Sequence, residues 1–120
     1  MLVEASQRVL ALLGANDLVA RLGGDEFAII QPVTVNAQEE ASLLAGKIVS
    51  ALREPFIIDK QDIHIGVSVG ISNAPLNSNN SHDLLHKADL ALYAAKAKGR
   101  DCYMHYTEGM TMGSSIIDRE

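Results

Sequence analysis

A short cluster of glycine and carboxylate residues near the start of the chain has the composition of a metal and phosphate site. Gly23 and Gly24 precede Asp25 and Glu26, so two carboxylates lie beside backbone that carries no side chains. A bulky anion such as a triphosphate could lie against this backbone. The carboxylates could hold Mg²⁺, whose usual ligands are one or two protein carboxylates together with substrate phosphates. The alternative is an ordinary solvated turn, because Gly-Gly-Asp is common turn chemistry.

Two cations near the other end of the chain could hold the same kind of anion. Lys96 and Arg100, here called the cationic pair, are four residues apart at the end of a predicted helix. At that spacing they could converge on one anion, Arg100 through a bidentate fork and Lys96 as a point charge. A terminal phosphate would suit them. The alternative is that each cation only complements the negative end of the helix dipole, which contributes about 0.3–1 kcal/mol.

The hydrophobic pattern predicts the elements that position the glycine and carboxylate cluster. Apolar residues at helical spacing predict a helix over residues 2–13. Residues 18–22 and 26–30 are short apolar segments, and the Gly-Gly pair between them is typical of a tight hairpin that needs positive φ. Asn36 lies three residues before Glu39, a variant of the capping box, and predicts the start of a second helix.

The second half of the chain predicts the elements that carry the cationic pair. Residues 63–71 alternate bulky side chains with small ones, which predicts a strand with one nearly bare face that something could approach closely. Residues 56–58 are expected to pair with the start of that strand. Ser81 is the expected N-cap of a third helix, which ends with Gly99 as the C′ residue. Residues 102–106 are predicted to form a final edge strand.

Length and charge restrict the classes of protein that this chain can form. A chain of 120 residues with 48% hydrophobic residues fits one globular domain. Ten basic and fifteen acidic residues give a net charge of −5, so no bulk positive field exists to attract nucleic acid or an anionic membrane. The apolar runs are far shorter than the roughly 20 residues of a membrane-spanning helix, and no secretory signal is visible. We therefore expect a cytoplasmic location, and the single cysteine, Cys102, excludes an intrachain disulfide.

Three motifs in order resemble those of the GGDEF family, bacterial diguanylate cyclases that condense two GTP into cyclic di-GMP. Residues 21–27 read RLGGDEF and resemble the signature that gives the family its name. Residues 68–71 (SVGI) look like a strand motif of the family, and residues 88–100 (ADLALYAAKAKGR) resemble its AD-x-ALY-x-AK-x-x-GR helix. The resemblance implies an α+β fold (an α/β sandwich), with a ferredoxin-like, nucleotidyl-cyclase palm sheet flanked by helices.

The resemblance also implies a role for each candidate residue. Asp25 and Glu26 correspond to catalytic carboxylates, and Asp25 would bind Mg²⁺ (or Mn²⁺) and help activate the ribose 3′-hydroxyl. Gly23 and Gly24 would leave room for the phosphates of GTP, and the cationic pair would hold its terminal phosphates. Because each protomer would carry one GTP, the active form implied is a face-to-face homodimer.

The chain departs from the family pattern at its start and in one regulatory motif. The first strand and helix of the family fold, with another metal-binding aspartate, are expected to be missing, so these residues alone are expected to be inactive. Residues 1–107 are predicted to be a partial GGDEF domain. Residues 108–120 are predicted to be a linker or the start of a connector helix to an EAL phosphodiesterase domain. Where many members carry R-x-x-D, this chain has Gly14 to Asp17, so product inhibition through that site is expected to be absent or weak.

Taken with its motifs, the sequence predicts a GGDEF domain that makes cyclic di-GMP and pyrophosphate from GTP in the intact parent protein. Two alternatives stay open at this point. One is a catalytically silent, GTP-binding regulatory module that controls an attached EAL phosphodiesterase. The other is an inactive truncated fragment.

Overall fold

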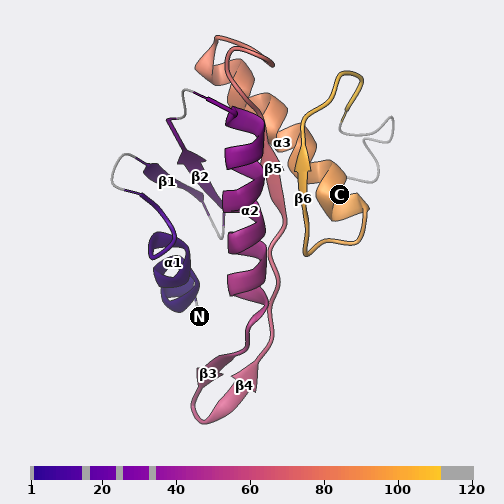
Figure 1. The fold of residues 1–120 in the computed structure, drawn as a ribbon. Helices are drawn as coiled ribbons and strands as arrows, with labels where there is room; N and C mark the ends of the chain where they lie inside the picture. Colours follow the sequence, from indigo (N-terminus) through magenta and orange to yellow (C-terminus); the bar gives the residue numbers. More distant parts are fainter. Residues whose placement is uncertain (1, 15–16, 24–25, 33–34, 112–120) are drawn as a thin grey trace. The chain divides into compact units, whose positions relative to one another are not determined.

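The computed structural model describes residues 2–14, 17–23, 26–32 and 35–111, and its described part contains three helices and six strands (Figure 1). By contacts the chain divides into two compact units, Met1–Ile65 and Gly66–Glu120. The predicted α+β class is confirmed. The elements in chain order are α1 (Leu2–Leu10), β1 (Leu18–Gly23), β2 (Glu26–Ile30), α2 (Ala37–Arg53), β3 (Phe56–Ile58), β4 (Gln61–Ile63), β5 (Val69–Ile71), α3 (Ser81–Ala97) and β6 (Tyr103–His105).

The described strands pair in three separate two-stranded sheets rather than in one palm sheet. β1 pairs with β2 and β3 with β4, both antiparallel, whereas β5 and β6 are parallel. Every described strand therefore has a partner on one edge only. The helices of the described part include none long and apolar enough to cross a membrane.

In the first unit, α1 packs against α2. The helix α1 ends at Leu10, earlier than the predicted Leu13, because the last turn tightens: the amides of Leu12 and Leu13 donate to carbonyls three residues back. Among the side chains of this unit that the structure describes, the buried apolar ones are Val9, Ala45, Ile48, Val49, Leu52 and Phe56.

The predicted capping box at the start of α2 is wrong. Asn36 is the N-cap residue, but its backbone is left-handed, with φ 55° and ψ 48°, and its side chain makes no capping hydrogen bond. A capping side chain normally requires an extended backbone at that position. The acidic first turn, with Glu39 and Glu40, complements the positive end of the helix dipole instead.

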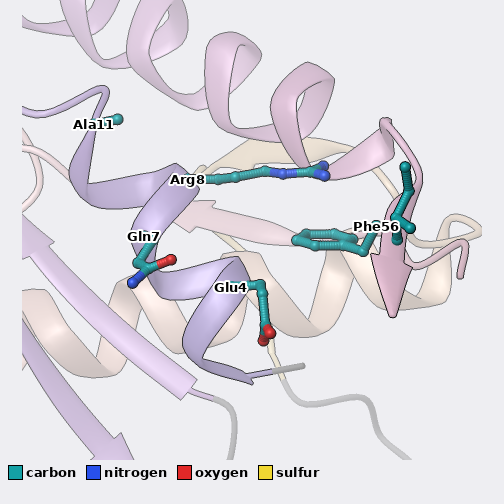
Figure 2. A pocket seen from close by; sticks show the side chains of 6 residues that line it. Glu4, Gln7, Arg8, Ala11 and Phe56 are labelled. Carbon is teal, nitrogen blue, oxygen red and sulfur yellow. The ribbon is translucent and has the colours of Figure 1, made fainter. Parts of the chain in front are cut away.

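The side chain of Arg8 closes the carboxyl end of α2 (Figure 2). Its Nη1 donates to the carbonyl oxygens of Ala51 (2.8 Å) and Glu54 (2.6 Å), and its Nη2 donates to that of Pro55 (2.8 Å). The last carbonyls of a helix have no partner within the helix, so Arg8 satisfies groups that would otherwise need water. The same guanidinium lies over the Phe56 ring (Figure 2), 3.5 Å from the ring centre.

The predicted strand over residues 63–71 is split in the structure. β4 ends at Ile63 and β5 begins at Val69, and none of the described strands pairs with residues 64–68. An alternating pattern predicts a pleat, but a strand also needs a neighbour to complete its hydrogen bonds. The predicted pairing of residues 56–58 with the start of this segment is confirmed. The two strands turn through Asp59 (φ 53°) and Lys60 (φ 64°), both left-handed.

In the second unit, β5 and β6 run parallel and are connected through α3, which packs on both strands (Figure 1). Ala91 and Ala95 of α3 are fully buried, and Ile71 of β5 and Leu90 of α3 are buried as well. The N-cap of α3 is Asn80 rather than the predicted Ser81. The Asn80 side-chain oxygen accepts a hydrogen bond from the Asp83 amide at 2.9 Å. Asn80 is therefore the cap, and Ser81 is the first residue of the helix.

The bare face of β5 is covered by the backbone of α3. A Cβ atom added at Gly70 would lie 2.1 Å from the carbonyl oxygen of Ala88 and 2.3 Å from the amide nitrogen of Leu92. Gly70 is one of the small residues predicted to let another group approach closely, and the group that approaches it is the backbone of α3. This packing fixes α3, and with it the backbone position of Lys96 relative to β5.

Candidate functional site

The β1–β2 hairpin carries the predicted carboxylate cluster at its tip. Its register pairs Leu18 with Ile30, and the last pair before the tip joins Gly23 to Glu26. The strand pairing therefore continues to the residues on either side of positions 24 and 25, in agreement with the predicted tight hairpin. The register shifts between Arg21 and Gly23, which is the pattern of a β-bulge. A bulge bends and twists a strand, and such irregularities are frequent next to active sites.

The structure places the predicted hairpin residues only in part. Gly24 and Asp25 lie outside the described residues. Gly23 is the last residue of β1 and Glu26 the first of β2, so their backbones are fixed by the ladder. The predicted metal ligand, Asp25, is thus bracketed in the sequence by two residues that pair with each other.

The cationic pair lies at the carboxyl end of α3. Lys96 is exposed in the last turn of the helix, which ends at Ala97. The Arg100 amide donates to the Ala95 carbonyl at 3.0 Å, across a Gly99 whose φ is 125°. This is the hydrogen bond of a Schellman motif with Gly99 at C′, as predicted.

Arg100 is exposed, but it is not part of the helix. Its φ is 65°, in the left-handed region, and Asp101 follows with φ 54°. Helical periodicity therefore does not set the direction of Arg100 relative to Lys96, contrary to the argument from spacing. The direction is set by the turn of residues 99–101, which sequence periodicity does not reveal.

One partly buried titratable group lies in the strand that follows this turn. His105 is on β6, and burial lowers the pKa of its imidazole below the ordinary value of 6.5. Desolvation disfavours the charged form of histidine. The neutral form of His105 is therefore favoured in the folded protein.

The side chains of the described part contain no group of three or more His, Cys, Asp or Glu residues placed to hold a metal ion. A magnesium site does not require such a group, because Mg²⁺ often uses one or two carboxylates together with phosphates and waters. Asp25 and Glu26 supply hard oxygen donors in adjacent positions. The donor chemistry at the hairpin tip therefore fits a magnesium ion held together with a substrate phosphate.

A separate hollow of about 410 Å³ lies within the first unit (Figure 2). Two of its lining residues are engaged with each other, because the Arg8 guanidinium lies over the Phe56 ring, and Arg8 also binds the end of α2. The predicted site residues do not line it. The described residues that line it are Glu4, Gln7, Arg8, Ala11, Phe56 and Ile57.

Sequence reasoning missed two residues that shape these regions. Arg8 has no signal in its spacing, because a single arginine on a helix usually faces water. Asp101 directly follows Arg100, and no pattern in the sequence indicates that it contacts Gly66. A Cβ added at Gly66 would lie only 3.0 Å from Oδ1 of Asp101.

The Asp17 carboxylate accepts a hydrogen bond from the Gly14 amide at 2.8 Å and so closes its own turn.

Comparisons with known proteins identify the family. Residues 1–102 match the family described as "Diguanylate cyclase, GGDEF domain". The bifunctional diguanylate cyclase/cyclic di-GMP phosphodiesterase MucR of Pseudomonas aeruginosa is 34% identical over 110 residues, which are 92% of this chain and 16% of MucR. The diguanylate cyclase TpbB of the same species is 35% identical over 102 residues, 83% of this chain and 23% of TpbB.

A solved structure gives the same result for the fold. A form of TpbB from Pseudomonas aeruginosa that comprises only the GGDEF domain aligns with a TM-score of 0.82 and 30% identity, covering 99% of this chain and 67% of that one. The chain spans less than a quarter of the length of MucR or TpbB. The family match covers the hairpin and the cationic pair alike. The chain therefore belongs to the GGDEF family of diguanylate cyclase domains.

Proposed function

We propose that this GGDEF domain condenses two molecules of GTP into cyclic di-GMP and releases two molecules of pyrophosphate. In each of the two steps, a ribose 3′-hydroxyl oxygen of one GTP bonds to the α-phosphorus of the other. The bond from that phosphorus to the bridging oxygen breaks, the hydroxyl loses its proton and pyrophosphate leaves. Membership of the family and the relation to MucR and TpbB support synthesis over the silent regulatory alternative.

The observation that carries this proposal is the register of the β1–β2 hairpin. Because Gly23 pairs with Glu26, the tip between them is short and its ends are held by the ladder. We assign Asp25 to binding of the metal and to activation of the attacking hydroxyl. Glu26, next to it in the chain, is the second catalytic carboxylate. The absence of side chains at Gly23 and Gly24 leaves room for the phosphates.

The proposed cofactor is Mg²⁺ or Mn²⁺, held by Asp25 together with phosphate oxygens. When bound, such an ion neutralises negative charge that develops on the departing pyrophosphate. The residues of the chain would supply the remaining charges: the carboxylates of Asp25 and Glu26, and the cations Lys96 and Arg100. Fixed charges of this kind stabilise a transition state without having to reorganise.

The cationic pair is proposed to hold the terminal phosphates of GTP. Lys96 and Arg100 are both exposed, and no carboxylate of the described residues forms an ion pair with either of them in the structure. Both lie at the carboxyl end of α3, where the helix dipole attracts cations and not anions. Phosphate binding there therefore has to come from the two side chains.

The finer features of the assembly are also proposals. Each protomer carries one GTP, so catalysis needs a homodimer in which two such sites face each other. The relation to a bifunctional cyclase and phosphodiesterase favours a parent that also carries a phosphodiesterase domain, and we propose that this is an EAL domain beyond the boundary near residue 107. Since GTP is a cytoplasmic substrate, we place the reaction in the cytoplasm, with no nucleic acid or membrane bound by this segment.

The function is tested by incubating this chain, and a form extended upstream, with GTP and Mg²⁺. We expect cyclic di-GMP and pyrophosphate from the extended form, and loss of both when EDTA removes the metal. Lys96→Ala in the extended form should raise KM for GTP about tenfold or more, because a charged hydrogen bond to phosphate is lost. Exposed Lys98 is a matched control, and Lys98→Ala should leave KM unchanged. GTP binding without any product would favour the regulatory alternative.

A further inference from the structure

The turn between α3 and β6 contains three consecutive residues with positive φ. Gly99 has φ 125°, Arg100 has φ 65° and Asp101 has φ 54°. Glycine adopts this region freely and aspartate tolerates it, but arginine does so at a cost of about 1 kcal/mol or more. A left-handed arginine persists only where the surrounding structure determines it.

Both ends of this turn are fixed by backbone hydrogen bonds. On the helix side, the amides of Lys98 and Arg100 donate to the carbonyls of Ala94 and Ala95, each at 3.0 Å. On the strand side, the Cys102 carbonyl accepts from the Val69 amide at 2.9 Å. Asp101 lies between these anchors.

The side chain of Asp101 lies against the backbone of Gly66. A Cβ atom added at Gly66 would be 3.0 Å from Oδ1 of Asp101, 3.2 Å from its Cγ and 3.3 Å from its Cβ. The same Oδ1 is buried. The carboxylate of Asp101 therefore occupies the space that any side chain at position 66 would take.

This contact explains why position 66 is a glycine. The backbone of Gly66 lies outside the left-handed region, so its own conformation does not require glycine. The space is needed for Asp101. Residues 66 and 101 thus hold each other across two segments of the second unit, next to Arg100.

We propose that Asp101 is a positioning residue that orients Arg100 for the terminal phosphate of GTP, an inference that rests on the proposed function. Packing of the Asp101 side chain on Gly66 fixes Asp101, the last residue of the turn with positive φ. Arg100, which precedes it, is then held from both sides. Asp101 itself touches no substrate; its contribution is the direction in which Arg100 points.

The test compares GTP kinetics of three variants in the extended form. Asp101→Gly keeps the left-handed backbone available but removes the packing contact, and should raise KM for GTP about five- to tenfold with kcat changed less than about twofold. Asp101→Asn retains the shape and the left-handed preference, and should stay close to the parent. Gly66→Ala pushes on the same contact from the other side, and should also raise KM.

A double variant separates positioning from unrelated damage. If the contact is the cause, Gly66→Ala should add little in the Asp101→Gly background, because the carboxylate that it displaces is already gone. The control is Glu108→Ala, an exposed acid of the same unit, which should leave KM and kcat unchanged. Melting temperatures are measured for every variant.

The outcomes distinguish this inference from the proposed function. If the parent makes no cyclic di-GMP and binds no GTP, the proposed function fails and this inference fails with it. If the parent is active and Asp101→Gly has an unchanged KM, the inference alone is overturned. It is also overturned if Asp101→Gly lowers the melting temperature and kcat while KM stays constant, since that pattern indicates a purely structural role.

Discussion

The guanidinium of Arg8 lies 3.5 Å from the centre of the Phe56 ring and also binds the carbonyl that precedes this residue, that of Pro55. One side chain thus covers the most buried aromatic ring of the described residues and satisfies the end of α2. A planar fork is needed for both contacts.

Replacing Arg8 by lysine should therefore destabilise the fold although the charge is kept. Lysine cannot serve three carbonyls and stack on the ring, so we expect a loss of about 1–3 kcal/mol in the free energy of unfolding. The measurement is urea unfolding. Neighbouring Gln7 is exposed, and Gln7→Ala is the control. An unchanged midpoint for Arg8→Lys would show that the clamp contributes nothing.

Gly70 should not tolerate even alanine. The added Cβ would meet backbone atoms of Ala88 and Leu92 at 2.1 and 2.3 Å, and these cannot move unless α3 shifts. We expect Gly70→Ala to lose about 1–3 kcal/mol or more. Gly14→Ala is a matched control, since its nearest neighbour would be 3.5 Å away. Equal melting temperatures for the two variants would contradict the close packing of α3 on β5.

Lys60 is strained in the β3–β4 turn, and glycine should relieve that strain. Its φ of 64° is unfavourable for lysine, whereas glycine loses some stability through chain entropy. The balance predicts that Lys60→Gly gains about 0.5–1 kcal/mol in thermal or urea unfolding. Gln61→Gly, one residue later in β4, should instead destabilise the hairpin. A destabilising Lys60→Gly would mean that the lysine side chain makes a larger contribution than its backbone costs.

His105 should make the fold sensitive to mild acid. Its pKa is lowered in the folded state, so the unfolded chain binds more protons between that pKa and the ordinary value of 6.5. Stability from this residue is therefore complete above pH 6.5 and is lost as the pH falls below it. We compare the free energy of unfolding of the parent and His105→Asn from about pH 8 to about pH 5.

The expected difference is a parent that loses stability toward acid more steeply than the variant. His64, an exposed residue of the first unit, provides the control, and His64→Asn should keep the profile of the parent. Parallel profiles for the parent and His105→Asn would contradict the effect of burial on this histidine.

The sequence predicted the elements well where local signals are strong. The Gly-Gly pair located the β1–β2 hairpin, whose ladder ends at Gly23 and Glu26. Gly99 marked the end of α3, because its φ of 125° is one that few other residues adopt. The residues of the site followed from motifs rather than from geometry. Their spacing alone allowed ordinary turn and helix-dipole explanations.

Features that depend on distant neighbours could not be predicted. Residues 64–68 alternate like a strand but have no described strand partner, and Asn36 has capping chemistry but a left-handed backbone. The contacts of Arg8 with Glu54 and of Asp101 with Gly66 join residues far apart in the chain. No local pattern records such contacts.

If the hairpin tip carries out cyclic di-GMP synthesis through Asp25, removal of this carboxylate should abolish the reaction. The extended form and its Asp25→Asn variant are incubated with GTP and Mg²⁺, and cyclic di-GMP is quantified, with folding checked by circular dichroism. We predict that Asp25→Asn loses at least about a hundredfold in turnover while its melting temperature is unchanged, since general acid–base and metal roles of one group commonly contribute that much. Turnover by Asp25→Asn equal to that of the parent would contradict the account.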